Sequence, residues 1–318
     1  PAWRMGLWTG LASAALATAA CTALLARSAT PSVLQRLLAR QAFLLAVPHA
    51  AFAMGLVLLI APSGWLLRAL SPWATGLLSP PPWPTTQDPW GLGLIAVLAL
   101  KETPFLLWAA GAHLLRPDVA QRLRRELQLA ASLGYGAQTA WWRIVWPQLL
   151  PRLAAPLLAV LAYSLTVVDV ALVIGPGTPP TLAALCWQWL QDANPQENAK
   201  GVAAAWTLAA TVLVCGAVAW ALLQAPFWRR QRTSGPARSA APTAAHGPAR
   251  ASAALTGIYL AVLAALLLGS FSGSWPFPEL LPTRWTRAAW ATMGDSLPTL
   301  WTTLWLATAS AGCALLWV

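Results

Sequence analysis

Seven long apolar stretches are the feature that most limits what this chain can fold into. Each has about 20 residues, the length an α-helix needs to cross the apolar core of a bilayer. Backbone groups in lipid must be paired within the chain, so the stretches are predicted to be helices of an all-α, polytopic transmembrane bundle. Only 9% of the 318 residues are charged, too few for a water-facing surface. The predicted spans are 5–26, 42–61, 90–112, 153–174, 202–223, 253–271 and 297–318.

Positive charges alternate between the segments that join these spans. Fourteen of the 20 Lys and Arg residues lie in the segments 27–40, 113–152 and 224–250. Loops rich in Lys and Arg stay in the cytoplasm, so these three are predicted to be cytoplasmic and the intervening loops external. The cations are spread between apolar runs and form no single basic face, so no nucleic-acid partner is expected. The partner of the apolar surface is the lipid bilayer, and the predicted location is the cell inner membrane.

A polar segment divides the chain into two parts. Residues 233–250 are small, polar and proline-rich, a composition typical of a flexible linker. The letters Leu-Trp-Thr open two apolar stretches, at 7–9 and again at 300–302, as in transporters built from repeated units. We therefore predict a first transmembrane unit of five spans at 1–223, a cytoplasmic linker at 224–250, and the truncated start of a second unit at 251–318.

The cytoplasmic segment 113–152 carries the most informative pattern. Asp118 followed by Gln121 resembles a capping box and predicts a helix from about Val119. Gly134 and Gly136 should end that helix, and a second short helix is predicted at 137–146. These properties also fit an amphipathic helix that lies on the membrane surface with its basic face near anionic lipid.

The same segment resembles the EAA motif of ABC-importer permeases, roughly E-A-A-x(3)-G-x(9)-I-x(2)-P. Two positions depart from the motif, with Gln in place of Glu and Leu in place of the first Ala. The stretches 48–65 and 167–182 look most like the fused permeases of the thiamine, iron(III) and sulfate group, closest to the thiamine type. The matching motif positions are Gln128, Leu129, Ala130, Gly134, Ile144 and Pro147.

The resemblance implies a type I ABC importer permease with the MetI-like fold. It further implies a cytoplasmic dimer of ABC ATPases that docks on this loop, a periplasmic substrate-binding protein, and thiamine or a related small solute as substrate. The chain contains no GxxxxGK[ST] phosphate loop, so ATP hydrolysis is expected in a separate subunit, with no cofactor and no catalytic residue here. The residues implied to couple to the ATPase are Gln128, Leu129, Ala130, Gly134, Trp141, Ile144 and Pro147.

Three charged residues and one histidine fall inside predicted spans. Lys101 and Glu102 lie in the third span and Asp169 in the fourth. Ionisable residues are costly in lipid, so these three are candidates for the translocation path, and inter-helix pairing is the alternative role. His49 in the second span is predicted to hydrogen-bond a neighbouring helix, because no second ligand lies at metal-binding spacing.

Two other classes of membrane protein remain as alternatives. A secondary transporter driven by an ion gradient would have broken helices in paired halves and would need no ATPase. A membrane-embedded enzyme would need catalytic polar residues gathered near one interface, and the sequence shows no such group.

Overall fold

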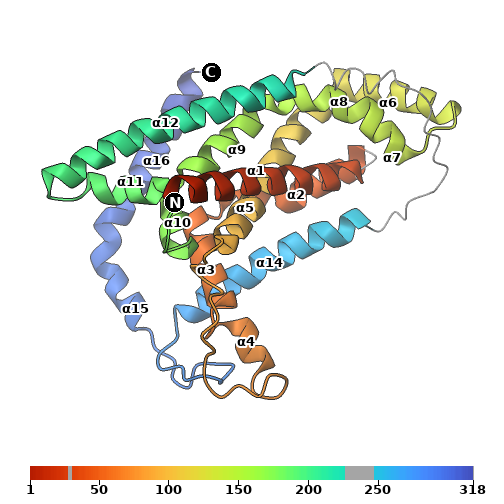
Figure 1. Cartoon of the computed structure of the whole chain (residues 1–318). Helices are drawn as coiled ribbons and strands as arrows, with labels where there is room; N and C mark the ends of the chain where they lie inside the picture. Colours follow the sequence, from red (N-terminus) through yellow and green to blue (C-terminus); the bar gives the residue numbers. More distant parts are fainter. Residues whose placement is uncertain (28–30, 226–246, 318) are drawn as a thin grey trace.

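The computed structural model describes residues 1–27, 31–225 and 247–317, shown in Figure 1. In these ranges every regular element is helical, which confirms the predicted all-α class. Short π and 3-10 turns at Trp141–Val145, Leu150–Leu153 and Thr292–Ser296 join some of the helices. The α-helices are α1 (Ala2–Ala26), α2 (Pro31–Ala46), α3 (His49–Ile60), α4 (Trp65–Leu70), α5 (Leu92–Leu114), α6 (Pro117–Ser132), α7 (Ala137–Ala140), α8 (Trp146–Leu149), α9 (Ala154–Thr166), α10 (Asp169–Ile174), α11 (Leu182–Leu190), α12 (Pro195–Leu223), α14 (Gly247–Gly269), α15 (Ala288–Ala291) and α16 (Leu297–Trp317).

Seven helical stretches are long and apolar enough to cross a membrane, as the sequence predicts. Helix α5 lies at the centre of the bundle and packs against α1, α2, α3 and α9. Apart from Lys101, Glu102, Thr103 and the terminal His113, its sequence is apolar, as expected for a helix buried among others. Of the candidate spans, α5 also has the largest buried share. Helix α5 therefore forms the axis around which the other helices are arranged.

Two predicted spans are interrupted rather than continuous. In the second span, α2 ends at Ala46 and α3 begins at His49. Pro48 explains this break, because proline has no N–H and forces the preceding residue out of the helical region. The fourth span is broken between α9 and α10, where Val167 has an extended backbone. The short helices α3 and α10 that follow the two breaks pack against each other.

The expected connections also need correction. Much of the predicted loop 27–40 is helix α2, which packs against α5. The predicted external loop 175–201 contains α11 and the first turns of α12. Asn194 caps α12 by accepting a hydrogen bond from the Gln196 N–H at 3.0 Å, and a proline follows the cap. Asn followed by Pro is a helix-start signal that the sequence interpretation overlooked.

Helix α6 begins earlier than predicted and without a capping box. It starts at Pro117, where a missing N–H costs nothing, with Arg116 at the N-cap and no side-chain cap. Asp118 instead lies in the first turn, where its carboxylate receives hydrogen bonds from the Arg116 guanidinium at 3.3 Å. The prediction of a cap at Asp118 with Gln121 is therefore wrong.

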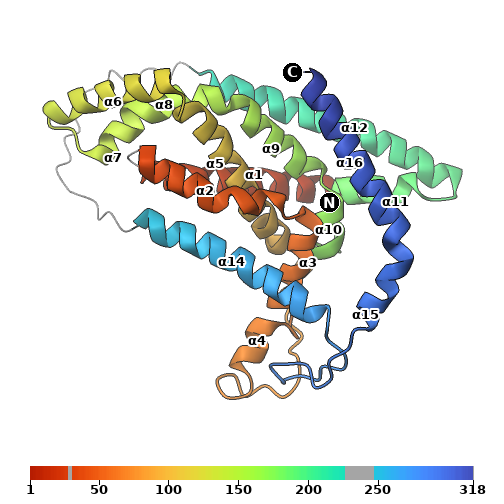
Figure 2. The ribbon, with the colours of Figure 1, turned by 180° about the vertical axis from the view of Figure 1, so that it is seen from behind.

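The two ends of the bundle differ in composition. The end of α1, the start of α2, the α6–α7 pair, the end of α12 and the start of α14 lie toward one end (Figures 1 and 2). These parts lie within or directly beside the three arginine-rich segments. Helix α4 and the segment between α14 and α15 lie together at the bottom of both views, away from that end. The common placement agrees with one cytoplasmic side for all three segments.

The division into units is only partly visible. Most of the predicted linker 224–250 lies outside the described residues, and α14 begins at Gly247 within it. Helix α14 packs against α2 and α3 of the first unit. Within the described part of the chain, no residue between Ala288 and Leu316 is buried, whereas α1, which shares the Leu-Trp-Thr letters, is extensively packed.

Candidate coupling hairpin and intramembrane site

The first candidate site is a helical hairpin formed by α6, a tight turn and α7. Gly134 adopts φ +84° in this turn, a left-handed conformation that glycine accepts without steric cost. The N–H groups of Gly134 and Tyr135 donate to the carbonyls of Ala131 and Ala130, both at 3.0 Å, and so close the end of α6. The glycine predicted to break the helix therefore sets the direction in which the chain returns.

The base of the hairpin is anchored in the bundle. A core cluster shared with α1, α2 and α5 contains Val119 and Leu123 of α6. It also contains Trp141 and Val145, which lie in the π-helical turn that follows α7. Across the hairpin, Gln148 donates to the Glu126 carboxylate at 2.6 Å. These contacts fix the base of the hairpin to the transmembrane helices.

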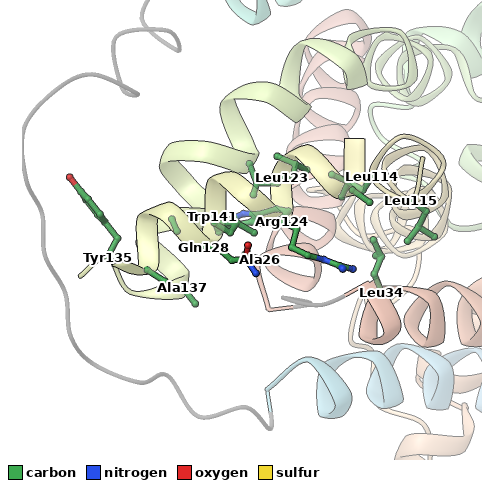
Figure 3. Close-up of a pocket in the computed structure, with 15 residues that line it drawn as sticks. Ala26, Leu34, Leu114, Leu115, Leu123, Arg124, Gln128, Tyr135, Ala137 and Trp141 are labelled. Atoms are coloured by element: carbon green, nitrogen blue, oxygen red, sulfur yellow. The ribbon is translucent and has the colours of Figure 1, made fainter. Parts of the chain in front are cut away.

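The tip of the hairpin is apolar and open. Leu129 and Leu133 are 65% and 67% exposed. They line a hollow of about 440 Å³ together with Ala130, Tyr135 and Ile144. A second hollow of about 410 Å³ lies on another flank of the hairpin, where Gln128, Arg124 and Trp141 contribute (Figure 3).

The structure divides the predicted coupling residues into two groups. Leu129, Ala130 and Ile144 line one hollow, while Gln128 and Trp141 line the other. Pro147 is buried beneath the hairpin and Trp141 is only 8% exposed, so both act in packing more than at the surface. Exposed Leu133 was not among the predicted residues, although its place beside Gly134 could have indicated it.

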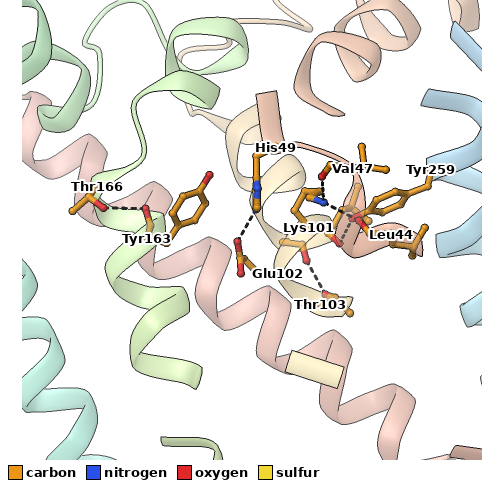
Figure 4. A network of polar contacts seen from close by, with 11 residues as sticks. Leu44, Val47, His49, Lys101, Glu102, Thr103, Tyr163, Thr166 and Tyr259 are labelled. Carbon is orange, nitrogen blue, oxygen red and sulfur yellow. Dashed lines mark hydrogen bonds and ion pairs between the residues drawn. The ribbon is translucent and has the colours of Figure 1, made fainter. Parts of the chain in front are cut away.

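The second candidate site surrounds Lys101 and Glu102 in the middle of α5. The Lys101 side chain points toward the end of α2, and the Glu102 side chain points toward the start of α3 (Figure 4). The Lys101 ammonium donates to the carbonyls of Leu44, at 2.9 Å, and Val47. It also lies 5.5 Å from the centre of the Tyr259 ring of α14, a distance compatible with a cation–π contact.

Glu102 forms the other half of this site. Its carboxylate lies 3.0 Å from Nε2 of His49, the first residue of α3. The His49 ring lies 4.8 Å from the ring of Tyr163 on α9. The expected inter-helix contact of His49 is present, and the partner that the sequence could not name is Glu102.

Asp169 lies apart from this pair. It is exposed in the first turn of α10, a position favourable for a carboxylate because of the helix dipole. Within the described ranges, no hydrogen bond or ion pair joins it to Lys101 or Glu102. The three candidates for the translocation path therefore form one buried pair of adjacent residues and one separate, exposed carboxylate.

Comparison with known proteins gives one informative match. Over 241 residues, 73% of the chain, the sequence is 37% identical to the inner membrane ABC transporter permease protein YnjC of Escherichia coli strain K12. The matched part is 43% of that relative, so the chain spans less than half of its length. No family model and no solved structure matches the chain. Together with the seven candidate spans, the match identifies the chain as a multi-pass inner-membrane protein that is similar to an ABC transporter permease.

Proposed function

We propose that the chain is the transmembrane permease subunit of an ATP-driven ABC importer, which forms the translocation path and docks on a dimer of cytoplasmic ATPases. The observation that supports this most is the α6–α7 hairpin, whose apolar tip is exposed while its base is anchored in the bundle. Its residues follow the spacing of the EAA motif, and the chain is similar to an ABC transporter permease. The hollow at Leu129 and Leu133 would receive an apolar ridge of the ATPase.

Loss of the apolar tip provides the direct test. Leu133→Asp should reduce recovery of ATP-hydrolysing activity with the purified full-length protein by about tenfold, as expected for an apolar anchor in an interface. The fold should be retained, because this side chain is already 67% exposed. Leu78→Asp is the matched control, since Leu78 is 75% exposed in the segment between α4 and α5. Equal recovery of ATPase activity with both variants would contradict the proposal.

The turn itself should matter independently of apolar contact. Gly134→Val places a branched side chain at φ +84°, a conformation that costs a non-glycine residue about 1–2 kcal/mol. No atom lies within 4 Å of the added Cβ, so the effect should come from the backbone and not from a clash. We expect weaker ATPase recovery without loss of the helical content measured by circular dichroism. Gly257→Val in α14 is the control, because that glycine also has open space around it and a helical backbone.

We also propose thiamine or a related small solute as the substrate, delivered by a periplasmic binding protein. The support is the resemblance of 48–65 and 167–182 to permeases of the thiamine group, and both stretches begin at a helix interruption. Exposed Asp169 and the partly accessible Glu102–His49 pair would contact a cationic solute on the translocation path. Lys101 would stabilise the neighbouring end of α2 through its hydrogen bond to the Leu44 carbonyl. Binding of labelled thiamine by the binding protein, followed by uptake into proteoliposomes, measures this directly.

A second permease unit is proposed to begin with α14 and α16. Helix α16 carries the Leu-Trp-Thr letters of α1 but has no buried residue between Leu297 and Leu316. In the first unit, α1 packs against α5 and α9. Equivalent helices of a second unit would supply the missing partners of α16.

The interrupted spans favour a second candidate function, a secondary transporter driven by an ion gradient. That class uses broken helices at its binding site. Here both interruptions lie within one unit, at Val47–Pro48 and at Val167–Val168. Solute uptake that persists in the absence of any ATPase would favour this function over the importer.

A further inference from the structure

The break in the second span leaves specific backbone groups without helical partners. In a continuous helix the carbonyl of Leu44 would accept from the N–H of residue 48, but residue 48 is proline and has none. The carbonyl of Val47 lies between α2 and α3. Lys101 donates to both carbonyls. Its positive charge also suits the C-terminal end of α2, where the helix dipole is negative.

The neighbouring residue holds the other side of the same break. Glu102 contacts His49, which begins α3, where the helix dipole is positive. Lys101 is 3% exposed and Glu102 is 6% exposed, so water solvates neither side chain well. Separating either one from its partners would leave a buried charge unpaired, which is strongly unfavourable. The two ends of the break are therefore held to one turn of α5.

Helix α5 connects this turn to the hairpin. It ends at Leu114, and α6 begins three residues later at Pro117. Leu106 and Leu107 of α5 lie in the core cluster that also contains Trp141 of the hairpin. Movement of the hairpin would therefore displace α5.

The external side is connected through α3 and α4. In α4, the Arg68 guanidinium donates to the carbonyls of Trp275, Pro276 and Glu279, at 3.1, 2.8 and 2.7 Å. These bonds fasten α4 to the segment between α14 and α15, and α4 also packs against α3. A shift of α3 relative to α2 would alter the external surface of the protein.

We propose that Lys101 and Glu102 are positioning residues that fasten both ends of the interrupted second span to α5, so that displacement of the hairpin is transmitted to the external pair α3–α4. The inference rests on the proposed function, because the hairpin moves only if an ATPase acts on it. It assigns to the two buried charges a role in coupling, in addition to the place of Glu102 on the proposed translocation path.

The test measures external exposure in response to nucleotide. Leu66, 58% exposed in α4, is replaced by Cys in the full-length protein purified with its ATPase, and Cys215 and Cys313 are replaced by Ser. In proteoliposomes, the rate of labelling by a membrane-impermeant maleimide is compared without nucleotide and with ATP and vanadate. We expect this background to show a change of about fivefold or more, the usual scale of coupling between sites. Lys101→Met should reduce the ratio to about one while ATP hydrolysis continues.

Two further variants make the result independent of folding. Pro48→Ala restores the N–H that Leu44 lacks and lets α2 and α3 join, so it should fold and still lose the response. Glu102→Gln keeps a hydrogen-bonding partner for His49, so this variant should lose only part of the nucleotide-dependent change in labelling. Lys200→Met, at an exposed lysine paired with Glu197 in α12, is the matched control and should respond fully.

The outcomes separate the two hypotheses. A full response in Pro48→Ala, together with a full response in Lys101→Met or failure of that variant to fold, overturns the positioning role. Absence of nucleotide-dependent labelling in the unsubstituted background, or of any copurified ATPase, instead refutes the proposed function. Loss of the response in Pro48→Ala with normal ATP hydrolysis supports the inference even if Lys101→Met does not fold.

Discussion

Replacing Arg68 by Ala is expected to destabilise the protein by about 3–4 kcal/mol. Arg68 is 5% exposed, and its guanidinium donates to four backbone carbonyls, those of Ser63, Trp275, Pro276 and Glu279. It also stacks on the Trp275 ring, 4.3 Å from its centre. Removal would take the shared donor from four carbonyls whose residues are exposed or half-buried. A hydrogen bond from a charged group contributes about 1.5–3 kcal/mol, and water would replace part of this. Thermal unfolding in detergent, monitored by circular dichroism, measures the loss.

The effect should be local to the part of the molecule that contains α4. Limited proteolysis of Arg68→Ala should cut the segment between α14 and α15 first, because its carbonyls no longer have a common donor. Arg287→Ala is the control, since that arginine is exposed in the same region. If both variants unfold at the same temperature, the contacts of Arg68 contribute little.

Gly55→Leu is expected to detach α14 from the first unit at a cost of about 3 kcal/mol, the upper part of the usual range for overpacking. A Cβ at Gly55 would lie 2.6 Å from a Val262 methyl and 2.8 Å from the Val262 carbonyl oxygen. The backbone of α14 cannot yield as a flexible side chain could. Small residues allow this kind of close approach between helices in lipid.

A matched glycine in α14 supplies the comparison. Gly257→Leu adds the same side chain where no atom lies within 4 Å of the new Cβ. Cross-linking between α3 and α14 through introduced cysteines should fail in Gly55→Leu and persist in Gly257→Leu. Persistent cross-linking in both would show that the α3–α14 contact is looser than the structure indicates.

The sequence predicted the membrane class because its signal, apolar length, acts within each helix separately. The number of spans is confirmed for this reason. The turn at Gly134 is confirmed because glycine adopts φ +84° without steric cost. The helix breaks within the second and fourth spans were not predicted, because hydropathy carries no information about backbone hydrogen bonds. Pro48 was nevertheless a signal for the first of these breaks. At the second break, Val167 and Val168 carry no comparable signal.

The candidate sites were only half predictable. The sequence identifies Lys101 and Glu102 as costly residues in lipid, but not their partners. Those partners are carbonyls and a histidine from a different span, placed by packing that no local pattern encodes. Likewise, Arg68 looked like a single external charge, and its role depends on a segment more than 200 positions away.

The contact between α2 and α14 has a consequence for how the two parts of the chain find each other. Fully buried Gln41 donates to the hydroxyls of Ser252 and Thr256, at 3.0 and 3.3 Å. Sliding α14 by one turn would strand three polar side chains in a hydrocarbon interior, where partners are scarce. The Gln41 amide thus favours one axial position of α14, a helix whose apolar surface would otherwise pack equally well at several positions.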